Sequence, residues 1–454
     1  MAPAAALLAA AFVGEPVLAH WTQTFMGGAA RFLAQFFPLF LRGAVFGKLM
    51  DDSGSALAVA RFTTEKLGQR RAALAVVLAC ALLTYGGVSL FVVAFAVVPV
   101  ADALFCQADI PHRLIPAAVV LGAFTFTSSA LPGTPAIQNV IPMSYFGTTP
   151  FAAPGLGVVA AAVVLVFGLW WLRRAKTAAR RIGEGYSPGP HADADGQLVR
   201  VRASTADTFD PAEAPHGHGE GLPSFPLAVL AMVVVMAVNL AMTALVLPRL
   251  DTGFLAEKRW SETSLAEVGG VWAVAVALLV AVVVLVLTNC RRLPVLRESV
   301  DAGANASVLP AFNTASQVGF GAVVATLPAF ALVREGLLAL GGGPLVSLPI
   351  ATGVIAGIIG SASGGLIIAL ETLGETYVAM ATQSGIDPGL MHRVAAMGAG
   401  TLDTLPHNGA VVTLLAVSGA THRESYRDIA VAGIVGPLVA LVVVIALGSA
   451  LGSF

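Results

Sequence analysis

The sequence predicts an all-α protein that crosses a membrane many times, and three observations carry this prediction. Hydrophobic residues make up 57% of the 454 residues and charged residues only 11%, whereas about a quarter of a soluble domain is charged. The apolar residues also fall in runs close to the roughly 20 residues with which a helix spans hydrocarbon. The clearest runs are 154–172, 225–247, 265–287 and 429–451. A transmembrane β-barrel would instead show short alternating segments.

Charge and motifs exclude several functional classes. A net charge of −1 offers no basic field for a nucleic acid, so we expect no nucleic-acid partner. The sequence contains no Walker loop, HExxH, GxSxG or Cys/His ligand set, which argues against an enzyme or a nucleotide-driven pump. We expect no cofactor beyond a co-transported H⁺ or Na⁺, and no metal site. The histidines of "HGHGEG" at 216–221 are too few for a good site and fit a solvated linker.

One long stretch, 173–222, is polar and rich in Arg, Pro, Gly, His and Asp. It cannot bury a core, and its arginines place it in the cytoplasm. The apolar residues 2–13 are too few to span a membrane and suggest a truncated first helix. These features divide the chain into an N-terminal segment (1–24), a first repeat (25–172), the linker (173–222), two connecting transmembrane helices (223–300) and a second repeat (301–454).

The two repeats are predicted from stretches that recur in the same order about 276 positions apart. "YGGVSLFVVAF" at 85–95 matches "SASGGLIIALE" at 361–371, and Leu131-Pro132 matches Leu405-Pro406. The other matches pair 42–49 with 320–327 and 108–118 with 385–396. Matches in register predict an internal repeat.

The cytoplasmic linker sets the direction of each segment before it. Segment 32–49 enters the cytoplasm, and 72–105 forms a re-entrant hairpin on that side with its tip at "TYGGVS". Segment 114–146 then crosses outward and 154–172 returns.

The segments after the linker follow the same logic. Segments 225–247, 265–287 and 308–333 cross in turn, and 345–382 forms a hairpin from the outside with its tip at "GSASGG". Segment 390–417 goes in and 429–451 goes out. With this topology most Lys and Arg residues lie on the cytoplasmic side, which agrees with the known excess of basic residues in cytoplasmic loops. The repeats are therefore predicted to be inverted, with about ten or eleven membrane segments.

Both repeats also break an apolar helix in the same way. "TSSALPGTPAIQN" at 127–139 and "TLDTLPHNGAVV" at 401–412 each place Leu-Pro before small or polar residues. The backbone groups that such a break frees are tolerated in a membrane only where they line a cavity. Broken helices in inverted repeats are typical of a transporter site near the midplane, and free helix N-termini suit an anion.

The substrate-binding candidates are the small and polar residues of the hairpin tips and breaks. They are Gly86, Gly87, Ser89, Ser361, Ser363 and Gly364 at the tips; Thr127, Ser128, Ser129, Thr134, Gln138 and Asn139 in the first break; and Thr401, Thr404, His407 and Asn408 in the second. Small residues at the tips could instead let helices pack closely. Hydroxyl groups could satisfy only local backbone, and His407 could bond a freed carbonyl as a neutral imidazole.

Three charged residues are candidates because ionisable groups at such depth are costly. Asp403 is the strongest candidate for coupling transport to H⁺ or Na⁺. Glu371 is the second, although it could face the scaffold or the outer water. Arg42 could bind a carboxylate, pair with an acid or extend its charged end to the interface.

Residues 36–54, 83–105 and 121–139 resemble the gluconate permease (GntP) family of bacterial symporters, and the similarity extends from about residue 31 to the C-terminus. The resemblance implies an inner-membrane, alternating-access symporter for a small organic anion such as gluconate or hydroxybutyrate, usually coupled to H⁺. The larger ion transporter superfamily combines a scaffold with two opposed hairpins and forms dimers, which implies a possible homodimer. An anion channel or exchanger of the same fold is the alternative.

Overall fold

The structure is a computed structural model that describes residues 2–187, 221–260, 262–293, 295–338 and 341–454. Within these ranges the chain forms helices and no strand, which confirms the all-α prediction. Among the described residues, six helices are long and apolar enough to cross a membrane: Val17–Asp52, Pro154–Arg181, Phe225–Arg249, Leu265–Asn289, Leu296–Thr326 and His422–Leu451. The protein is therefore a multi-pass membrane protein. Shorter apolar helices among the described residues are Pro3–Phe12 near the N-terminus and Val92–Gln107, Pro344–Ile359 and Gly409–Ser418, which belong to hairpins or broken helices.

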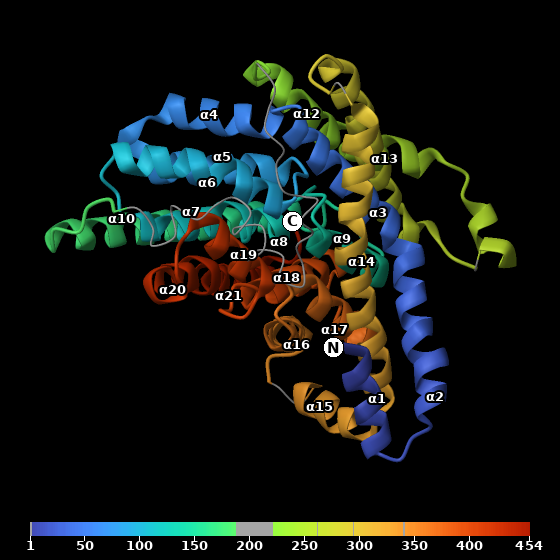
Figure 1. Ribbon diagram of the computed structural model, residues 1–454. Coiled ribbons are helices and arrows are strands. Elements are labelled where there is room, and N and C mark those ends of the chain that lie inside the picture. The colour runs from blue at the N-terminus through green and yellow to red at the C-terminus, as the bar shows by residue number, and fades with distance from the viewer. Residues whose placement is uncertain (1, 188–220, 261, 294, 339–340) are drawn as a thin grey trace.

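The first half is built around one hairpin and one broken helix (Figure 1). Its helices are α1 (Ala2–Phe12), α2 (Val17–Ala19), α3 (Met26–Asp52), α4 (Ser55–Leu67), the hairpin arms α5 (Ala72–Tyr85) and α6 (Leu90–Gln107), the broken helix α7 (Ile115–Ala123), α8 (Phe126–Ser129) and α9 (Ile137–Phe146), and α10 (Pro154–Arg181). Two connecting helices follow, α12 (Phe225–Ala241) and α13 (Leu265–Asn289).

The second half repeats this order of elements. Its helices are α14 (Leu296–Thr326), α15 (Pro328–Leu338), the hairpin arms α16 (Pro344–Ile359) and α17 (Ala362–Gln383), the broken helix α18 (Pro388–Thr401) and α19 (Gly409–Ser418), and α20 (His422–Ala430) with α21 (Gly436–Leu451). Both hairpins lie within two residues of the stretches predicted for them. The opposite orientation of the halves in the membrane stays a prediction.

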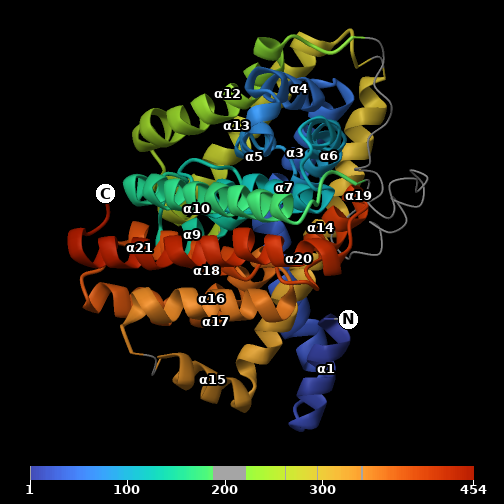
Figure 2. The same ribbon diagram turned by 90° about the vertical axis from the view of Figure 1, so that its left-hand side faces the viewer.

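The contacts between the halves are reciprocal. The long helices α3 and α14 pack side by side, and so do α10 and α21 (Figure 2). Helix α9 of the first half packs on α17 of the second, and α19 of the second packs on α6 of the first. Each broken helix therefore touches the hairpin of the other half, which brings residues more than 200 positions apart into one core.

The predicted domain boundaries stay predictions, and the helices differ from the expected segments in detail. Helix α3 starts at Met26, close to the predicted start of the first repeat, and the apolar span that contains it extends back to Val17. Helix α10 continues to Arg181, past residue 173; basic residues at a helix C-terminus interact favourably with the helix dipole. Helix α4 was not expected at all, because exposed Arg61, Glu65 and Lys66 interrupt its apolar pattern. Residues 216–220 of the histidine-rich stretch lie outside the described residues.

Candidate functional site

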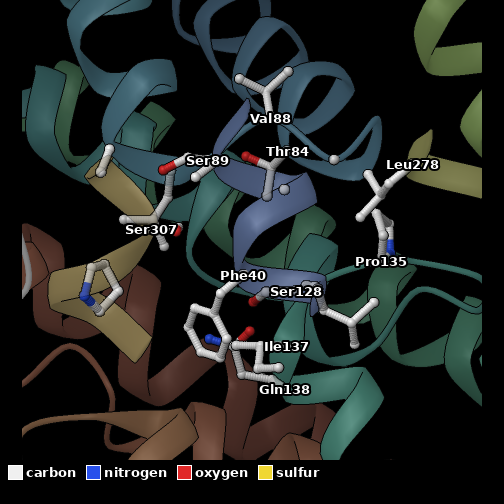
Figure 3. Close-up of a pocket in the computed structure, with 18 of the residues that line it drawn as sticks. Phe40, Thr84, Val88, Ser89, Ser128, Pro135, Ile137, Gln138, Leu278 and Ser307 are labelled. Carbon is white, nitrogen blue, oxygen red and sulfur yellow. The ribbon is translucent and has the colours of Figure 1, made fainter. Parts of the chain in front are cut away.

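A cavity of about 240 Å³ lies where the tip of the first hairpin, the first break and the long helices α3 and α14 meet (Figure 3). Sites for drug-sized ligands have about 300–1,000 Å³, so this cavity suits a smaller molecule. The residues that line it are Leu39, Phe40, Gly43, Ala44, Thr84, Gly87, Val88, Ser89, Leu90, Ala123, Ser128, Pro135, Ala136, Ile137, Gln138, Leu278, Ala306, Ser307 and Pro310.

The cavity wall is mostly apolar and carries a few hydroxyl groups and one amide. Figure 3 shows Thr84 and Ser89 on the hairpin side and Ser128 and Gln138 on the side of the break. Two of the hydroxyls bond local carbonyls: Ser128 Oγ lies 3.0 Å from Thr125 O, and Ser307 Oγ lies 2.6 Å from Ala304 O. The Thr84 hydroxyl is buried and has no hydrogen-bond partner among the described residues.

Two helices begin at the cavity, and neither has a side-chain cap. Helix α6 starts at Leu90 after Ser89, and α9 starts at Ile137 after Ala136. The first N–H groups of a helix have no partner within the helix, and they give its N-terminus a partial positive charge. Two such ends at one small cavity favour an anion.

The hairpin tip is held against the break by its local geometry. Gly87 has a φ of +92°, which is accessible to glycine at little cost. A Cβ atom there would lie 3.2 Å from Pro135 Cγ. The Tyr85 hydroxyl donates a 2.8 Å hydrogen bond to Pro132 O. The tip and the break therefore form one wall of the cavity.

Four of the predicted first-half residues line the cavity: Gly87, Ser89, Ser128 and Gln138. The others do not. A Cβ on Gly86 would lie 2.5 Å from Met232 Cε, so Gly86 serves close packing against α12. The polar groups of the break satisfy local backbone: Thr127 Oγ1 bonds Gly122 O, Ser129 Oγ bonds Thr125 O, and Thr134 Oγ1 accepts a hydrogen bond from Ala136 N.

The second half is arranged differently, because its break is docked onto its own hairpin tip. The N–H of Ala362 donates to Asp403 Oδ1 at 2.7 Å, and Asn408 Nδ2 donates to the same oxygen at 2.9 Å. Asn408 Nδ2 also donates to Gly360 O at 2.8 Å. His407 Nε2 lies 2.9 Å from Gly357 O, so its imidazole bonds a helix-end carbonyl. Asp403 is therefore not an isolated carboxylate.

Side chains also cap the helix N-termini in this half. Ser361 Oγ accepts a hydrogen bond from Gly364 N at 3.2 Å and lies 3.3 Å from Ser363 Oγ. At α19, Asn408 Oδ1 accepts from Ala410 N at 2.8 Å. The positive ends of α17 and α19 are thus occupied by the protein itself, in contrast to those of α6 and α9.

The remaining second-half candidates have structural surroundings. Thr401 Oγ1 donates to Gly398 O, and Thr404 packs against Gly433. A Cβ on Gly364 would collide with Gln317 of α14, so that glycine allows a close helix approach. Glu371 is exposed and accepts a 2.8 Å hydrogen bond from the Tyr145 hydroxyl. It lies nine residues, or about 14 Å, along α17 from the tip.

Two residues that were not predicted hold the first break in place. Arg393 is fully buried on α18. Its Nη1 donates to Ser129 O at 3.0 Å and to Asn139 Oδ1 at 3.1 Å, and its Nη2 donates to Ala152 O at 2.6 Å. No carboxylate of the described residues forms an ion pair with it. His392 lies beside it and bonds Asn139 as well.

A signal for this pair was present in the repeat. The matched stretches 108–118 and 385–396 each contain a His-Arg pair, His112-Arg113 and His392-Arg393. The second pair lies within an apolar segment, where a charged residue is a functional candidate by default. Asn139 was predicted to bind substrate, but its amide instead connects the break to α18.

Known proteins resemble this chain in sequence and in fold. Residues 4–180 match the family described as GntP family permease. The chain is 41% identical over 419 residues to the uncharacterized transporter YxjC of Bacillus subtilis (strain 168), which covers 91% of this chain and 86% of that protein. The structure of Neisseria gonorrhoeae MtrF, which is described as illuminating a class of antimetabolite efflux pumps, matches over 94% of this chain and 84% of that one. Its TM-score of 0.52 at 14% identity reflects a shared fold alone.

Proposed function

Because this chain belongs to the GntP permease family, we propose that it is a secondary transporter that takes up a small organic-acid anion together with H⁺ across a bacterial inner membrane. The observation that carries the proposal is the convergence of two uncapped helix N-termini on a cavity of about 240 Å³. The substrate carboxylate binds at the N-termini of α6 and α9, and its hydroxyl groups meet Thr84, Ser89 and Gln138. A hydroxy acid of the gluconate or hydroxybutyrate class fits this arrangement.

The buried guanidinium of Arg393 supports the choice of an anion. It bonds Ser129 and Asn139, and their chain neighbours Ser128 and Gln138 line the cavity. The guanidinium of Arg393 therefore contacts residues that are adjacent in the chain to two residues of the cavity wall. In a region of low dielectric constant such a charge acts over several ångströms, and it raises the potential inside the cavity without touching the substrate.

Asp403 is our candidate for the coupling group. Its carboxylate faces the N-terminus of α17 and holds the second hairpin tip to the second break. A proton that neutralises the carboxylate removes its attraction to the helix dipole and loosens this tip. Two N–H donors occupy Oδ1, so this oxygen is a poor ligand for Na⁺, and we propose H⁺ as the coupling ion. The two hairpins then move one after the other and expose the cavity alternately to each side of the membrane.

Counterflow in proteoliposomes tests the proposal. Vesicles loaded with one unlabelled hydroxy acid should accumulate the same labelled acid without an ion gradient, because a carrier exchanges substrate. A pH gradient should then drive net uptake. Passive conductance without counterflow would instead indicate an anion channel. Uptake that requires Na⁺ would indicate that Na⁺, rather than H⁺, is the coupling ion. Mass measurement of the purified protein in detergent tests the homodimer that we also propose.

A further inference from the structure

A second pocket lies at the opposite end of the first hairpin from its tip. It has a volume of about 90 Å³ and is formed between the start of α5, the end of α6 and the C-terminal part of α10. That volume is about the volume that three water molecules occupy in the liquid, and it suits a phosphate group. Four basic residues, Arg70, Arg71, Arg173 and Lys176, surround an apolar base. The apolar residues are Ala72, Ala73, Leu74, Phe105, Ile110, Leu114, Leu169 and Leu172.

The pocket lies where hydrocarbon meets the lipid headgroups. Arg70 and Arg71 directly precede the apolar helix α5, and after Leu172 the apolar part of α10 gives way to arginines. Both changes occur at the rim of this one pocket. Trp170, one turn from the rim on α10, is 52% exposed, and tryptophan is enriched at the headgroup level of membranes.

The charge in the pocket is not balanced by the protein. Arg70, Arg71, Arg173 and Lys176 form no ion pair with any described residue. Their neighbours Arg174 and Arg180 add to the positive charge. Asp109, which interacts with Lys176, accepts a 2.9 Å hydrogen bond from Tyr186 N and contributes one negative charge to this region. Like charges so close together repel, and an anion between them removes that repulsion.

We propose that this pocket binds the phosphate of an anionic phospholipid headgroup. The basic residues surround the phosphate, while Leu169 and Leu172 contact the start of the acyl chains. Basic pockets between transmembrane helices on the cytoplasmic side bind such headgroups in other membrane proteins. A soluble phosphate ester offers the same anion, but the position at the hydrocarbon boundary favours the lipid. The proposal is independent of the transported substrate, because the pocket shares no lining residue with the 240 Å³ cavity.

The test measures lipid binding to the full chain in a neutral detergent by native mass spectrometry. Phosphatidylglycerol should bind more tightly than phosphatidylcholine, and glycerol 1-phosphate should not displace it at equal concentration. Each basic residue near an anionic lipid contributes about fivefold, so Arg71→Gln with Arg173→Gln should weaken phosphatidylglycerol binding about thirtyfold. The matched control, Arg291→Gln with Arg423→Gln, removes two exposed arginines on the same predicted side of the membrane and should leave binding unchanged.

Three outcomes overturn the proposal. Equal binding of the two lipids would show that the headgroup charge does not determine binding. Equal loss of binding in both double variants would show that the lipid does not bind in this pocket. Displacement by glycerol 1-phosphate would identify a soluble ligand. If the glutamine pair does not fold, Arg71→Lys with Arg173→Lys retains the charges and should retain binding to within severalfold. In the wild-type protein, phosphatidylglycerol binding should weaken from low to high salt, and binding that does not change with salt contradicts the proposal.

Discussion

The backbone N–H of Ala362 donates a 2.7 Å hydrogen bond to the carboxylate of Asp403. This contact joins the first residue of α17 to the break between α18 and α19, so the tip of the second hairpin and the second break form one unit. An acid at a helix N-terminus stabilises that helix by itself. Asp403 therefore has a structural role in this arrangement, and its proposed coupling role requires that this contact open during transport.

The first prediction concerns coupling at Asp403. Asp403→Asn retains an oxygen that can accept from Ala362 but loses the charge, so substrate exchange should persist while accumulation driven by a pH gradient is lost. Both are measured in proteoliposomes. The matched control is Asp387→Asn, because Asp387 also accepts a backbone N–H, that of Gly389, and asparagine caps a helix equally well. It should retain both activities. If Asp403→Asn accumulates substrate like wild type, Asp403 is structural and Glu371 becomes the next residue to test.

The second prediction concerns the unpartnered hydroxyl in the cavity. Thr84→Val removes a hydroxyl that has no partner in the described protein, so the melting temperature should stay unchanged or rise. If the hydroxyl meets substrate, KM should increase by up to about tenfold, the value of one neutral hydrogen bond. Thr413→Val is the control, because that hydroxyl is also buried and unpartnered among the described residues but does not line the cavity. An equal change of KM in both variants would show that the Thr84 hydroxyl does not contact the substrate.

The third prediction concerns the buried Arg393. Arg393→Met leaves Ser129 O and Ala152 O without this donor, whereas Asn139 Oδ1 retains its contact with His392, and each unsatisfied buried acceptor costs about 1–3 kcal/mol. We expect a loss of at least about 2 kcal/mol, visible as a lower melting temperature in detergent. Arg393→Lys should lose less, because it retains the charge and one donor. The exposed residue Arg423, replaced by methionine, should change stability by less than about 0.5 kcal/mol. A wild-type melting temperature for Arg393→Met would contradict the structural role.

The fourth prediction concerns orientation in the membrane. The exposed Cys106 and Cys290 would react with any thiol reagent, so the experiment uses a chain without Cys80, Cys106 and Cys290. In that background Ser187→Cys should be labelled only from the cytoplasm, and Thr252→Cys only from outside. The excess of basic residues near Ser187 motivates this assignment. Labelling on the opposite sides would reverse the topology of both halves.

Local features of the sequence determined the membrane class, the two hairpins and the two breaks. Long apolar runs specify membrane helices whatever their neighbours are, and the Gly-Gly, Gly-Ser and Leu-Pro positions mark where those helices turn or stop. Only the tertiary structure decided which polar groups face the cavity. Gly87 and Gln138 line it, whereas Asp403 caps a helix and Asn139 bonds Arg393, although all four lie at hairpin tips or breaks in the sequence. The reason is that each partner comes from a distant segment: Arg393 reaches across 254 positions to Asn139. Such a partner depends on how the two halves pack against each other, and the pattern around either residue alone does not contain it.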